Sequence, residues 1–368
     1  MKIELDGGAL HDALGSAIYE RNSTLPILGC ALLDADGSKL RVTTSDLEAY
    51  FSAELDAKVS DAGRICVNID LLKAAAREGK LSLQHNADSS IVQASPKGGS
   101  KLRLPAMKAD AFPVPDEADW QPLSIEKMQL LRGLRAVSYA VARDDAKMAF
   151  MRGVSLADGL LSAGNGHRIA LFDIEYSGPE FVIPGAQISS LLPLITAESQ
   201  LHLAVTNGIP RMLRARAGDR LLIVRLLDAK FPQLRALANG RDESEMRGVF
   251  DREKLRNATR QFLPFCGRGG IKGRALANAA NLIAADGAAK LQAGENEENC
   301  SWALGDLSGE IRFGISLPYL AEALGAIDAD KVRIIEVRIA GAPPRLMIEP
   351  VTAGGDAVET HVIAEMQL

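Results

Sequence analysis

The sequence has few of the residues that build metal sites, disulfide scaffolds and base-stacking platforms. It holds four cysteines and five histidines, and no two cysteines form a Cys-x-x-Cys pair or stand beside a histidine at metal-ligand spacing. We therefore expect free thiols, no metal site and no cofactor. Aromatic residues make up only 5% of the chain, which is too few for obvious base-stacking platforms. The four cysteines are Cys30, Cys66, Cys266 and Cys300.

Long hydrophobic runs and an excess of positive charge are also missing. No apolar run is long enough to span a bilayer, and the N-terminal MKIELDGG lacks the apolar region of a signal peptide. These absences predict a soluble, cytoplasmic protein. Lysine and arginine total 42 against 47 acidic residues, a net charge of −5. This balance argues against nucleic-acid binding unless the cations gather on one face.

What the sequence does contain is a long internal repeat. Gly29, Gly153 and Gly273 each stand three residues before a leucine in an apolar, strand-like run. Their spacing of about 120 residues is far longer than the roughly 20–50 residues of solenoid units. The repeat therefore predicts three globular domains, with boundaries at 1–120, 123–241 and 245–368.

The same elements recur in each repeat. Apolar residues at helical spacing precede each glycine motif, and a second helix is expected at 70–80, 186–199 and 318–327. Strands with period-two alternation follow each second helix, which indicates a sheet with one buried face. Each domain is therefore an α+β unit of two helices packed on antiparallel sheets. Linkers are expected near Trp120–Ser124 and Ala238–Met246.

Basic residues recur on these helices. On the first helix of the third repeat, three arginines at i, i+4 and i+8 share one face. For any one helix, a solvated face is the simpler interpretation, but the recurrence favours contacts to a DNA backbone without reading of the bases. The DNA-binding candidates are Arg21, Lys73, Arg77, Lys80, Arg132, Arg135, Arg252, Arg256 and Arg260.

Five sequence motifs carry a resemblance that covers the whole chain. They are Thr24-Leu-Pro-Ile-Leu-Gly29, Thr44-Ser-Asp-Leu-Glu48, Ala109-Asp-Ala-Phe-Pro113, Gly166-His-Arg168 and Leu227-Asp-Ala-Lys-Phe-Pro232. In this order and spacing they resemble the bacterial sliding clamp family, the beta subunits of DNA polymerase III. The resemblance implies a non-catalytic processivity factor. Its subunits form a head-to-tail homodimeric ring around duplex DNA, with DNA-clamp domains whose helices line the inside.

The family resemblance also implies sites. The polymerase alpha subunit, the clamp loader and other partners would dock short peptides, typically Gln-Leu-x-Leu-Phe, between the second and third domains. By position that pocket comprises Met151, Gly166, His167, Arg168, Ile169, Pro232, Leu237, Val362, Ile363 and Met366. Residues 366–368 are expected to contribute to peptide binding. The dimer interface would use the edge strand with Leu102 and Leu104.

Several residues depart from the family pattern. Gly164 stands where a hydroxyl residue is usual, Asn165 where Asp is usual, and Ala236 where Arg is common. Near the C-terminus, Ala364-Glu365 stands where Met-Pro often occurs. Weaker binding of a generic clamp-binding peptide is therefore expected.

Two other functions remain open from the residues alone. The Gly-rich segment 266–273 contains Arg268 and Lys272 and could cradle phosphate in a hydrolase, although it lacks the Gly-Lys-Ser/Thr ending of a P-loop. The chain could also be a protein-interaction scaffold with no role on DNA. Turnover dependent on a metal and a nucleotide would indicate the hydrolase. Partner binding without loading onto circular DNA would indicate the scaffold.

Overall fold

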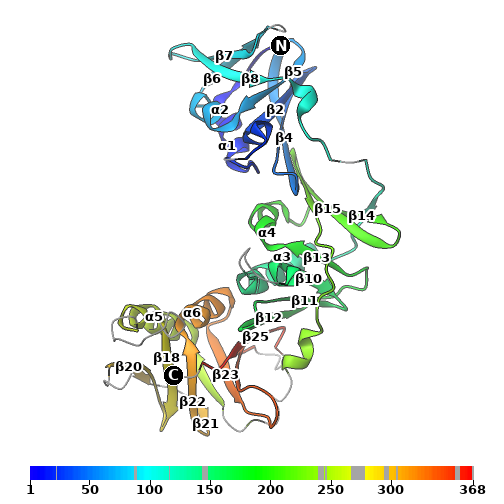
Figure 1. Cartoon of the computed structure of the whole chain (residues 1–368). Helices are drawn as coiled ribbons and strands as arrows, with labels where there is room; N and C mark the ends of the chain where they lie inside the picture. Colours follow the sequence, from blue (N-terminus) through cyan, green and yellow to red (C-terminus); the bar gives the residue numbers. More distant parts are fainter. Residues whose placement is uncertain are drawn as a thin grey trace. The chain divides into compact units, whose positions relative to one another are not determined.

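The structure is a computed structural model of the whole chain. It describes residues 1–368 except 22, 87–88, 116, 143–147, 239–243, 245–246, 267–277, 294–297, 304–305, 353–356 and 367–368. The chain forms two compact units, one of Met1–Met128 with Gln187–Leu226 and one of Gln129–Ala186 with Leu227–Leu368. Both units combine helices with antiparallel sheets (Figure 1), so the α+β prediction is confirmed. Of the repeat motifs, the one around Gly273 lies outside the described residues, as do Asn22 and most of the Gly-rich segment.

The first unit is built on a twelve-stranded sheet in the order β1-β6-β7-β8-β5-β2-β3-β4-β16-β15-β14-β9. Every described pairing in it is antiparallel, and β4 continues the sheet by pairing with β16. Its strands are β1 (Lys2–Asp6), β2 (Cys30–Asp36), β3 (Lys39–Ser45), β4 (Ala49–Asp61), β5 (Gly63–Asn68), β6 (Lys80–His85), β7 (Ile91–Pro96), β8 (Leu102–Met107), β9 (Trp120–Pro122), β14 (Gln200–Thr206), β15 (Ile209–Ala217) and β16 (Arg220–Arg225).

The second unit has a nine-stranded sheet, β13-β10-β11-β12-β25-β24-β23-β17-β21, and a four-stranded sheet, β20-β19-β18-β22. The strand β25, near the C-terminus, joins the nine-stranded sheet by pairing with β12 on one side and β24 on the other. Its strands are β10 (Gly153–Ala157), β11 (Leu160–Gly164), β12 (Arg168–Asp173), β13 (Phe181–Pro184), β17 (Arg247–Asp251), β18 (Ala279–Ala285), β19 (Ala288–Ala293), β20 (Glu298–Ala303), β21 (Asp306–Ser308), β22 (Ile311–Ser316), β23 (Lys331–Val337), β24 (Arg345–Pro350) and β25 (Glu359–Ala364).

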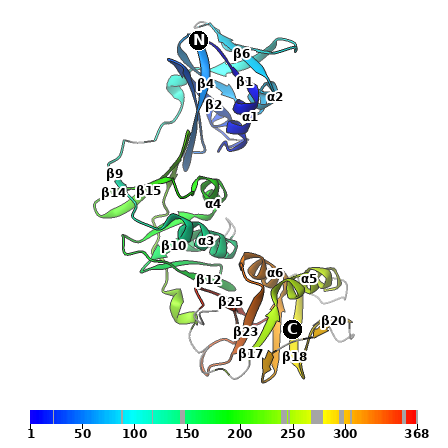
Figure 2. The ribbon, with the colours of Figure 1, turned by 180° about the vertical axis from the view of Figure 1, so that it is seen from behind.

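Side-chain caps mark the start of α1, α2 and α5. Asp6 accepts a hydrogen bond from the Ala9 amide at the start of α1, and Asp251 accepts one from the Lys254 amide at the start of α5. Helices α5 and α6 lie side by side (Figures 1 and 2). The helices are α1 (Gly7–Gly15), α2 (Ile69–Ala75), α3 (Lys127–Val137), α4 (Gly185–Leu191), α5 (Arg252–Phe262) and α6 (Leu317–Ala326). Short 3-10 turns are η1 (Pro26–Gly29), η2 (Ala109–Ala111), η3 (Ser138–Ala140), η4 (Ala149–Arg152), η5 (Leu192–Leu194), η6 (Leu234–Ala238) and η7 (Leu263–Phe265).

Three elements differ from the sequence prediction. Helix α2 ends at Ala75 rather than Lys80, because the backbone leaves the helical region at Ala76, which has a ψ of 86°. Gly79, with a φ of 92°, then turns the chain into β6. Helix α4 ends at Leu191, and Pro193 then forces a 3-10 turn in place of the predicted continuation to Ser199. The expected linker at Trp120–Ser124 contains the short strand β9, which pairs with β14.

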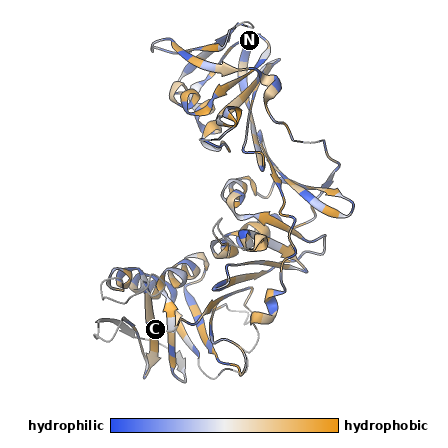
Figure 3. Ribbon diagram, viewed as in Figure 1, coloured by the Kyte–Doolittle hydropathy of each residue, from blue (hydrophilic) through white to orange (hydrophobic). Residues whose placement is uncertain are grey.

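Buried and more exposed positions alternate along strands such as β6 and β7, whereas β12 and β24 are buried almost throughout. Hydrophobic residues are distributed over the helices and strands of both units (Figure 3). In the second unit, α3 approaches its sheet closely at Gly133. A Cβ built there would lie 2.5 Å from Leu161 and 2.7 Å from Phe172, so only glycine fits this crossing. Among the described residues no helix is long and apolar enough to cross a membrane. The three-domain division remains a prediction, since the compact units follow different boundaries.

Candidate functional site

A tight turn between β11 and β12 presents the Gly166-His-Arg168 motif. The Asn165 side-chain oxygen accepts hydrogen bonds from the amides of His167 and Arg168, each at 3.1 Å. Gly166 has a φ of 87°, a left-handed conformation that glycine adopts without a Cβ penalty. The turn leaves His167 exposed, and its carbonyl accepts the amide of Ala364 from β25 at 2.9 Å.

A cavity of about 390 Å³ opens beside this turn, wholly within the second unit. Its wall is largely apolar, and eight of the ten residues that the family resemblance implies for a peptide pocket lie on it. Residues from four separate chain segments therefore meet at one cavity. The eight are Met151, Gly166, His167, Arg168, Ile169, Pro232, Leu237 and Val362.

The other two predicted pocket residues lie elsewhere. Along β25, side chains alternate between the faces of the sheet, so Val362 and Ala364 face the cavity while Ile363 packs into the core with Phe313 and Leu320. Ile363 is therefore placed behind the cavity wall. Met366 is not part of the wall, and its amide donates to the Gly314 carbonyl at 2.9 Å.

Arg168 lines the cavity but its guanidinium is held inside the protein. It stacks between the rings of Tyr139 and Tyr319, at 4.9 and 4.4 Å from their centroids. It also donates to the Glu322 carboxylate and to the Tyr139 carbonyl. Arg168 therefore connects β12 to α6 and η3. Of the predicted pocket residues His167 and Arg168, His167 is the one whose side chain is accessible to a ligand.

Eight further residues line the cavity, and the sequence analysis assigned none of them to it. Phe150 and Phe231 contact each other edge to face, with ring centroids 5.5 Å apart. Both lie within motifs already singled out in the sequence, so they could have been found. Pro343 and Pro344 had no such signal, because only the pairing of β24 with β25 brings them to the cavity. The eight are Phe150, Gly164, Phe231, Leu234, Pro343, Pro344, Arg345 and Ala364.

Buried ionisable groups lie on the opposite face of β25. The His361 ring is fully buried beside Tyr139, whose hydroxyl lies 2.9 Å from its Nδ1. Burial lowers the pKa of His361 to about 3, so the ring is neutral. Burial raises the pKa of Glu359 to about 7, although the charge of Arg132 lowers it. Glu359 thus titrates near neutral pH in the folded protein.

The DNA-binding candidates of the first unit are spread over several elements. Arg21 is exposed and pairs with Asp70 at 3.0 Å. The hydrogen bond from the Tyr19 hydroxyl, and then that from Arg21, hold the pKa of the Asp70 carboxyl below its usual range. Lys73 lies on α2, but Arg77 follows the end of that helix. Lys80 begins β6 and pairs with Glu4 at 2.6 Å. Lys73, Arg77 and Lys80 therefore do not share one helix face, because α2 ends at Ala75.

In the second unit, Arg132 and Arg135 are exposed on α3. The three arginines of α5 are not equivalent. Arg252 is half-buried and donates to the carbonyls of Ala329 and Leu324, at 2.6 and 3.2 Å. It thereby caps the C-terminal end of α6.

Arg256 is also half-buried, and its guanidinium lies 3.2 Å from the position of a Cβ on Gly325. Arg260 alone of the three is fully exposed. Of the three arginines on this face of α5, Arg260 is therefore the most accessible to solvent.

The candidate dimer strand β8 is paired on only one side over much of its length. Residues 102–105 pair with β7, and only residues 106–107 pair with β5. No described strand pairs with the other edge of Leu102–Pro105, which leaves main-chain groups for another chain. Leu102 is 37% exposed, but Leu104 is 4% exposed and already belongs to the core.

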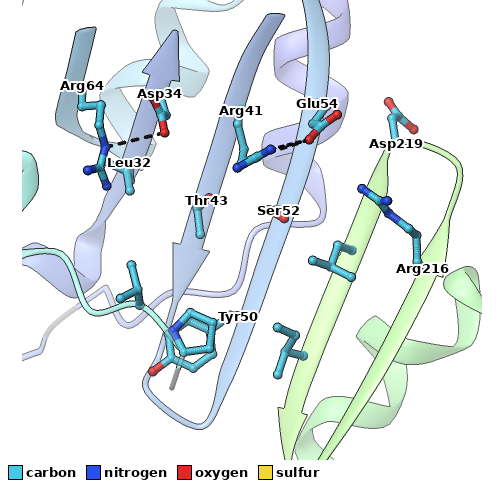
Figure 4. Close-up of a pocket in the computed structure, with 14 residues that line it drawn as sticks. Leu32, Asp34, Arg41, Thr43, Tyr50, Ser52, Glu54, Arg64, Arg216 and Asp219 are labelled. Carbon is cyan, nitrogen blue, oxygen red and sulfur yellow. Dashed lines mark hydrogen bonds and ion pairs between the residues drawn. The ribbon is translucent and has the colours of Figure 1, made fainter. Parts of the chain in front are cut away.

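A second cavity of about 360 Å³ lies on the sheet of the first unit (Figure 4). Its charged side chains face one another across neighbouring strands. Arg41 pairs with Glu54 at 2.7 Å, and Arg64 lies 3.6 Å from Asp34. Because opposite charges satisfy each other there, this surface is a cross-strand charge ladder rather than a prepared ligand site. The described residues contain no group of three or more His, Cys, Asp or Glu that could hold a metal ion.

Comparison with known sequences gives one consistent result. The beta sliding clamp of Pseudomonas aeruginosa is 26% identical over 341 residues, which cover 88% of this chain and 89% of that protein. The beta sliding clamp of Pseudomonas putida is 28% identical over 345 residues, with the same coverage. No family model matches the sequence.

Comparison with solved structures agrees over the full length. A crystal structure of the Pseudomonas aeruginosa sliding clamp, DNA polymerase III subunit beta, bound to griselimycin has a TM-score of 0.81 at 22% identity and covers 100% of both chains. The Caulobacter crescentus sliding clamp gives a TM-score of 0.81 at 20% identity, again with full coverage. The chain is therefore similar in sequence to bacterial beta sliding clamps over 88% of its length, and it shares their fold over its full length.

Proposed function

We propose that two copies of this chain close head to tail into a ring around duplex DNA and tether polymerases and the clamp loader in the cytoplasm. The observation that carries the proposal is the apolar cavity of the second unit, where eight residues implied by the family resemblance come together. A tether must hold partners that come and go. A shallow apolar cavity with few polar groups suits short peptides of modest affinity.

The cavity offers anchoring surfaces of two kinds. Phe150, Phe231 and Leu237 provide apolar contacts for an aliphatic or aromatic peptide side chain. His167 is the exposed polar group, suited to hydrogen bonding a glutamine side chain or the peptide backbone. We expect a Gln-Leu-x-Leu-Phe peptide to bind with a Kd in the micromolar range.

Ring closure would use the open edge of β8. Main-chain groups of Leu102–Pro105 are free to pair with an edge strand of a second copy, and exposed Leu102 would pack at that contact. Leu102→Lys is therefore the appropriate variant, because Leu104→Lys would also disturb the core. Light scattering should give a mass of twice 39.3 kDa for the natural chain and a monomer for Leu102→Lys.

Contacts to DNA would come from the exposed cations Arg21, Arg77, Arg132, Arg135 and Arg260. Binding to linear DNA should be weak, sequence-independent and salt-sensitive, since closure of the ring supplies retention. Neutralising Arg132, Arg135 and Arg260 together should flatten the salt dependence. Neutralising Arg252 should instead destabilise the contact between α5 and α6.

The deciding experiment is topological. The chain is loaded onto circular primed DNA with the clamp loader and ATP, and the DNA is then cut once with a restriction enzyme. The proposal expects stable retention on the circle and rapid loss after cutting. Equal retention on circular and cut DNA would contradict encirclement, and failure to load with intact peptide binding would favour the scaffold alternative. The hydrolase alternative has no support from the relatives, which are sliding clamps.

A further inference from the structure

We propose that the ion pair between Arg338 and Glu365 is a latch that fixes one wall of the cavity for peptide docking. The inference rests on the proposed function, because it assigns these two residues a positioning role at the same cavity. Neither side chain lines the cavity. Both act through the chain segment that follows β25.

The latch is anchored on a buried carboxylate. Glu336 in β23 is 2% exposed, and its Oε2 accepts the amide of Arg312 at 2.9 Å. Its Oε1 accepts from Nε of Arg338 at 2.5 Å. The Nη2 group of the same Arg338 guanidinium donates to Oε1 of Glu365 at 2.9 Å. Since Glu336 already orients the guanidinium, Glu365 meets a preorganised donor rather than a flexible surface side chain.

Glu365 sits where the chain leaves the sheet. The amides of three successive residues donate to three different segments: Ala364 to the His167 carbonyl at 2.9 Å, Glu365 to Pro344 at 3.1 Å, and Met366 to Gly314 at 2.9 Å. His167, Pro344 and Ala364 all line the cavity. Holding Glu365 in place therefore holds the Ala364 wall against Pro344 and keeps Met366 directed to Gly314.

Without the ion pair, the remaining described hydrogen bonds of this segment are those of the Ala364, Glu365 and Met366 amides. A released segment would carry the apolar Met366 into the neighbourhood of an apolar cavity, where it would compete with the peptide.

The test measures the latch and the cavity separately. Glu365→Gln keeps the shape and removes the charge, and Arg338→Gln removes the donor. A double variant closes the thermodynamic cycle. Glu54→Gln is the matched control, because it breaks an arginine–glutamate pair of similar geometry in the first unit, Arg41 with Glu54 at 2.7 Å. Thermal unfolding checks that every variant is folded.

Two measurements test whether the ion pair fixes the cavity wall. Amide hydrogen exchange at Glu365 and Met366 should speed up in both single variants and not in the control. The affinity for a labelled Gln-Leu-x-Leu-Phe peptide should fall about two- to five-fold, the range expected for one partly exposed ion pair. The double variant should lose no more than either single variant, because the two residues act as one contact.

Unchanged exchange in Glu365→Gln would overturn the latch. Faster exchange with unchanged affinity would overturn its positioning role. Additive losses in the double variant would also overturn it, because they would indicate direct contact of Glu365 with the peptide. If the natural chain shows no saturable binding, the peptide part of the proposed function fails, and hydrogen exchange still decides whether the latch exists.

Discussion

Two turns, one in each unit, share a backbone construction and open onto different surfaces. In the second unit, Asn165 accepts the amides of the residues two and three positions on, around Gly166 with a φ of 87°. In the first unit, Asp46 accepts the amides of Glu48 and Ala49, at 3.0 and 2.7 Å, around Leu47 with a φ of 76°. The hydrogen-bonded frame of the turn is therefore the same in both.

The strands that follow these turns are also in equivalent register. Ile169 of β12 pairs with Val362 of β25, as Tyr50 of β4 pairs with Ile223 of β16. Two positions further along, Ala364 corresponds to Arg225. Position by position, the side chains can therefore be compared.

The side chains make the two surfaces chemically different. Beside the first turn, a cavity of about 770 Å³ is lined by Glu48, Glu117, Asp119, Arg211 and Arg225 among its residues. The exposed His167 beside the turn of the second unit corresponds to Glu48 in the first unit. The small side chain of Ala364 corresponds to the long, charged side chain of Arg225. An apolar anchor would gain little there and would desolvate charges. A repeated backbone frame thus opens onto an apolar cavity only where the side chains leave apolar surface exposed.

The largest change in peptide affinity should come from placing the charged residues of the first unit's turn region at the equivalent positions of the second unit. His167→Glu with Ala364→Arg should weaken binding of a Gln-Leu-x-Leu-Phe peptide by about 100-fold, or about 2.7 kcal/mol. The reason is that two charges would replace an accessible polar group and an apolar wall. Fluorescence polarisation with a labelled peptide measures this loss.

The reciprocal variant, Glu48→His with Arg225→Ala, is the control. It changes the equivalent positions in the first unit and should leave the affinity within a factor of about two. A comparable loss in both variants would mean that the peptide does not distinguish the two surfaces.

A smaller effect concerns the buried carboxylate of Glu359, which pairs in register with Phe172. The equivalent position in the first unit is Arg220, which pairs with Ala53. Because burial raises the pKa of Glu359 from 4.5 to about 7, the folded state keeps a proton that the unfolded state releases between these pH values. The natural chain therefore loses stability as pH rises from about 4.5 to 7, and no further above that.

Glu359→Gln removes this loss. The variant should match the natural chain at pH 4.5 and exceed it by about 2–3 kcal/mol at pH 8. Urea unfolding at a series of pH values measures the difference, and Arg220→Gln should show no such pH dependence. A stability difference that does not vary with pH would exclude the titration of Glu359 as its source.

The smallest effect concerns the turns themselves. Gly166→Ala places a Cβ in a left-handed conformation and should lower the free energy of unfolding by about 1 kcal/mol. Leu47→Gly relieves the same conformation and should not lower it, because the leucine side chain is exposed at the turn. Equal destabilisation by both substitutions, seen in thermal unfolding, would show that the turns are held differently.

Sequence reasoning predicted the α+β fold and eight of the sixteen residues that line one cavity, because these follow from local periodicity and from motifs in family order. It failed where the answer depended on strand pairing or on side-chain packing. Val362 and Ile363 are neighbours in sequence, but the alternation of β25 places them on opposite faces. Period-two alternation could have separated them before the structure was known.

Other differences required the tertiary structure. The helical spacing of Arg252, Arg256 and Arg260 is real, but only the position of α6 shows that the first two are engaged by it. Likewise, Arg168 has the sequence position of a ligand-binding cation, yet two tyrosines from distant segments enclose it. Pro343 and Pro344 reach the cavity only through the pairing of β24 with β25.

Hydrogen exchange of the whole chain, with and without a saturating Gln-Leu-x-Leu-Phe peptide, tests the central claim most directly. The account predicts slower exchange at residues 150–151, 166–169, 231–237 and 362–364, with no change at residues 46–50, 117–119 and 223–226. Protection confined to the segments of the first unit, or absent from both, would contradict the assignment of partner docking to the apolar cavity of the second unit.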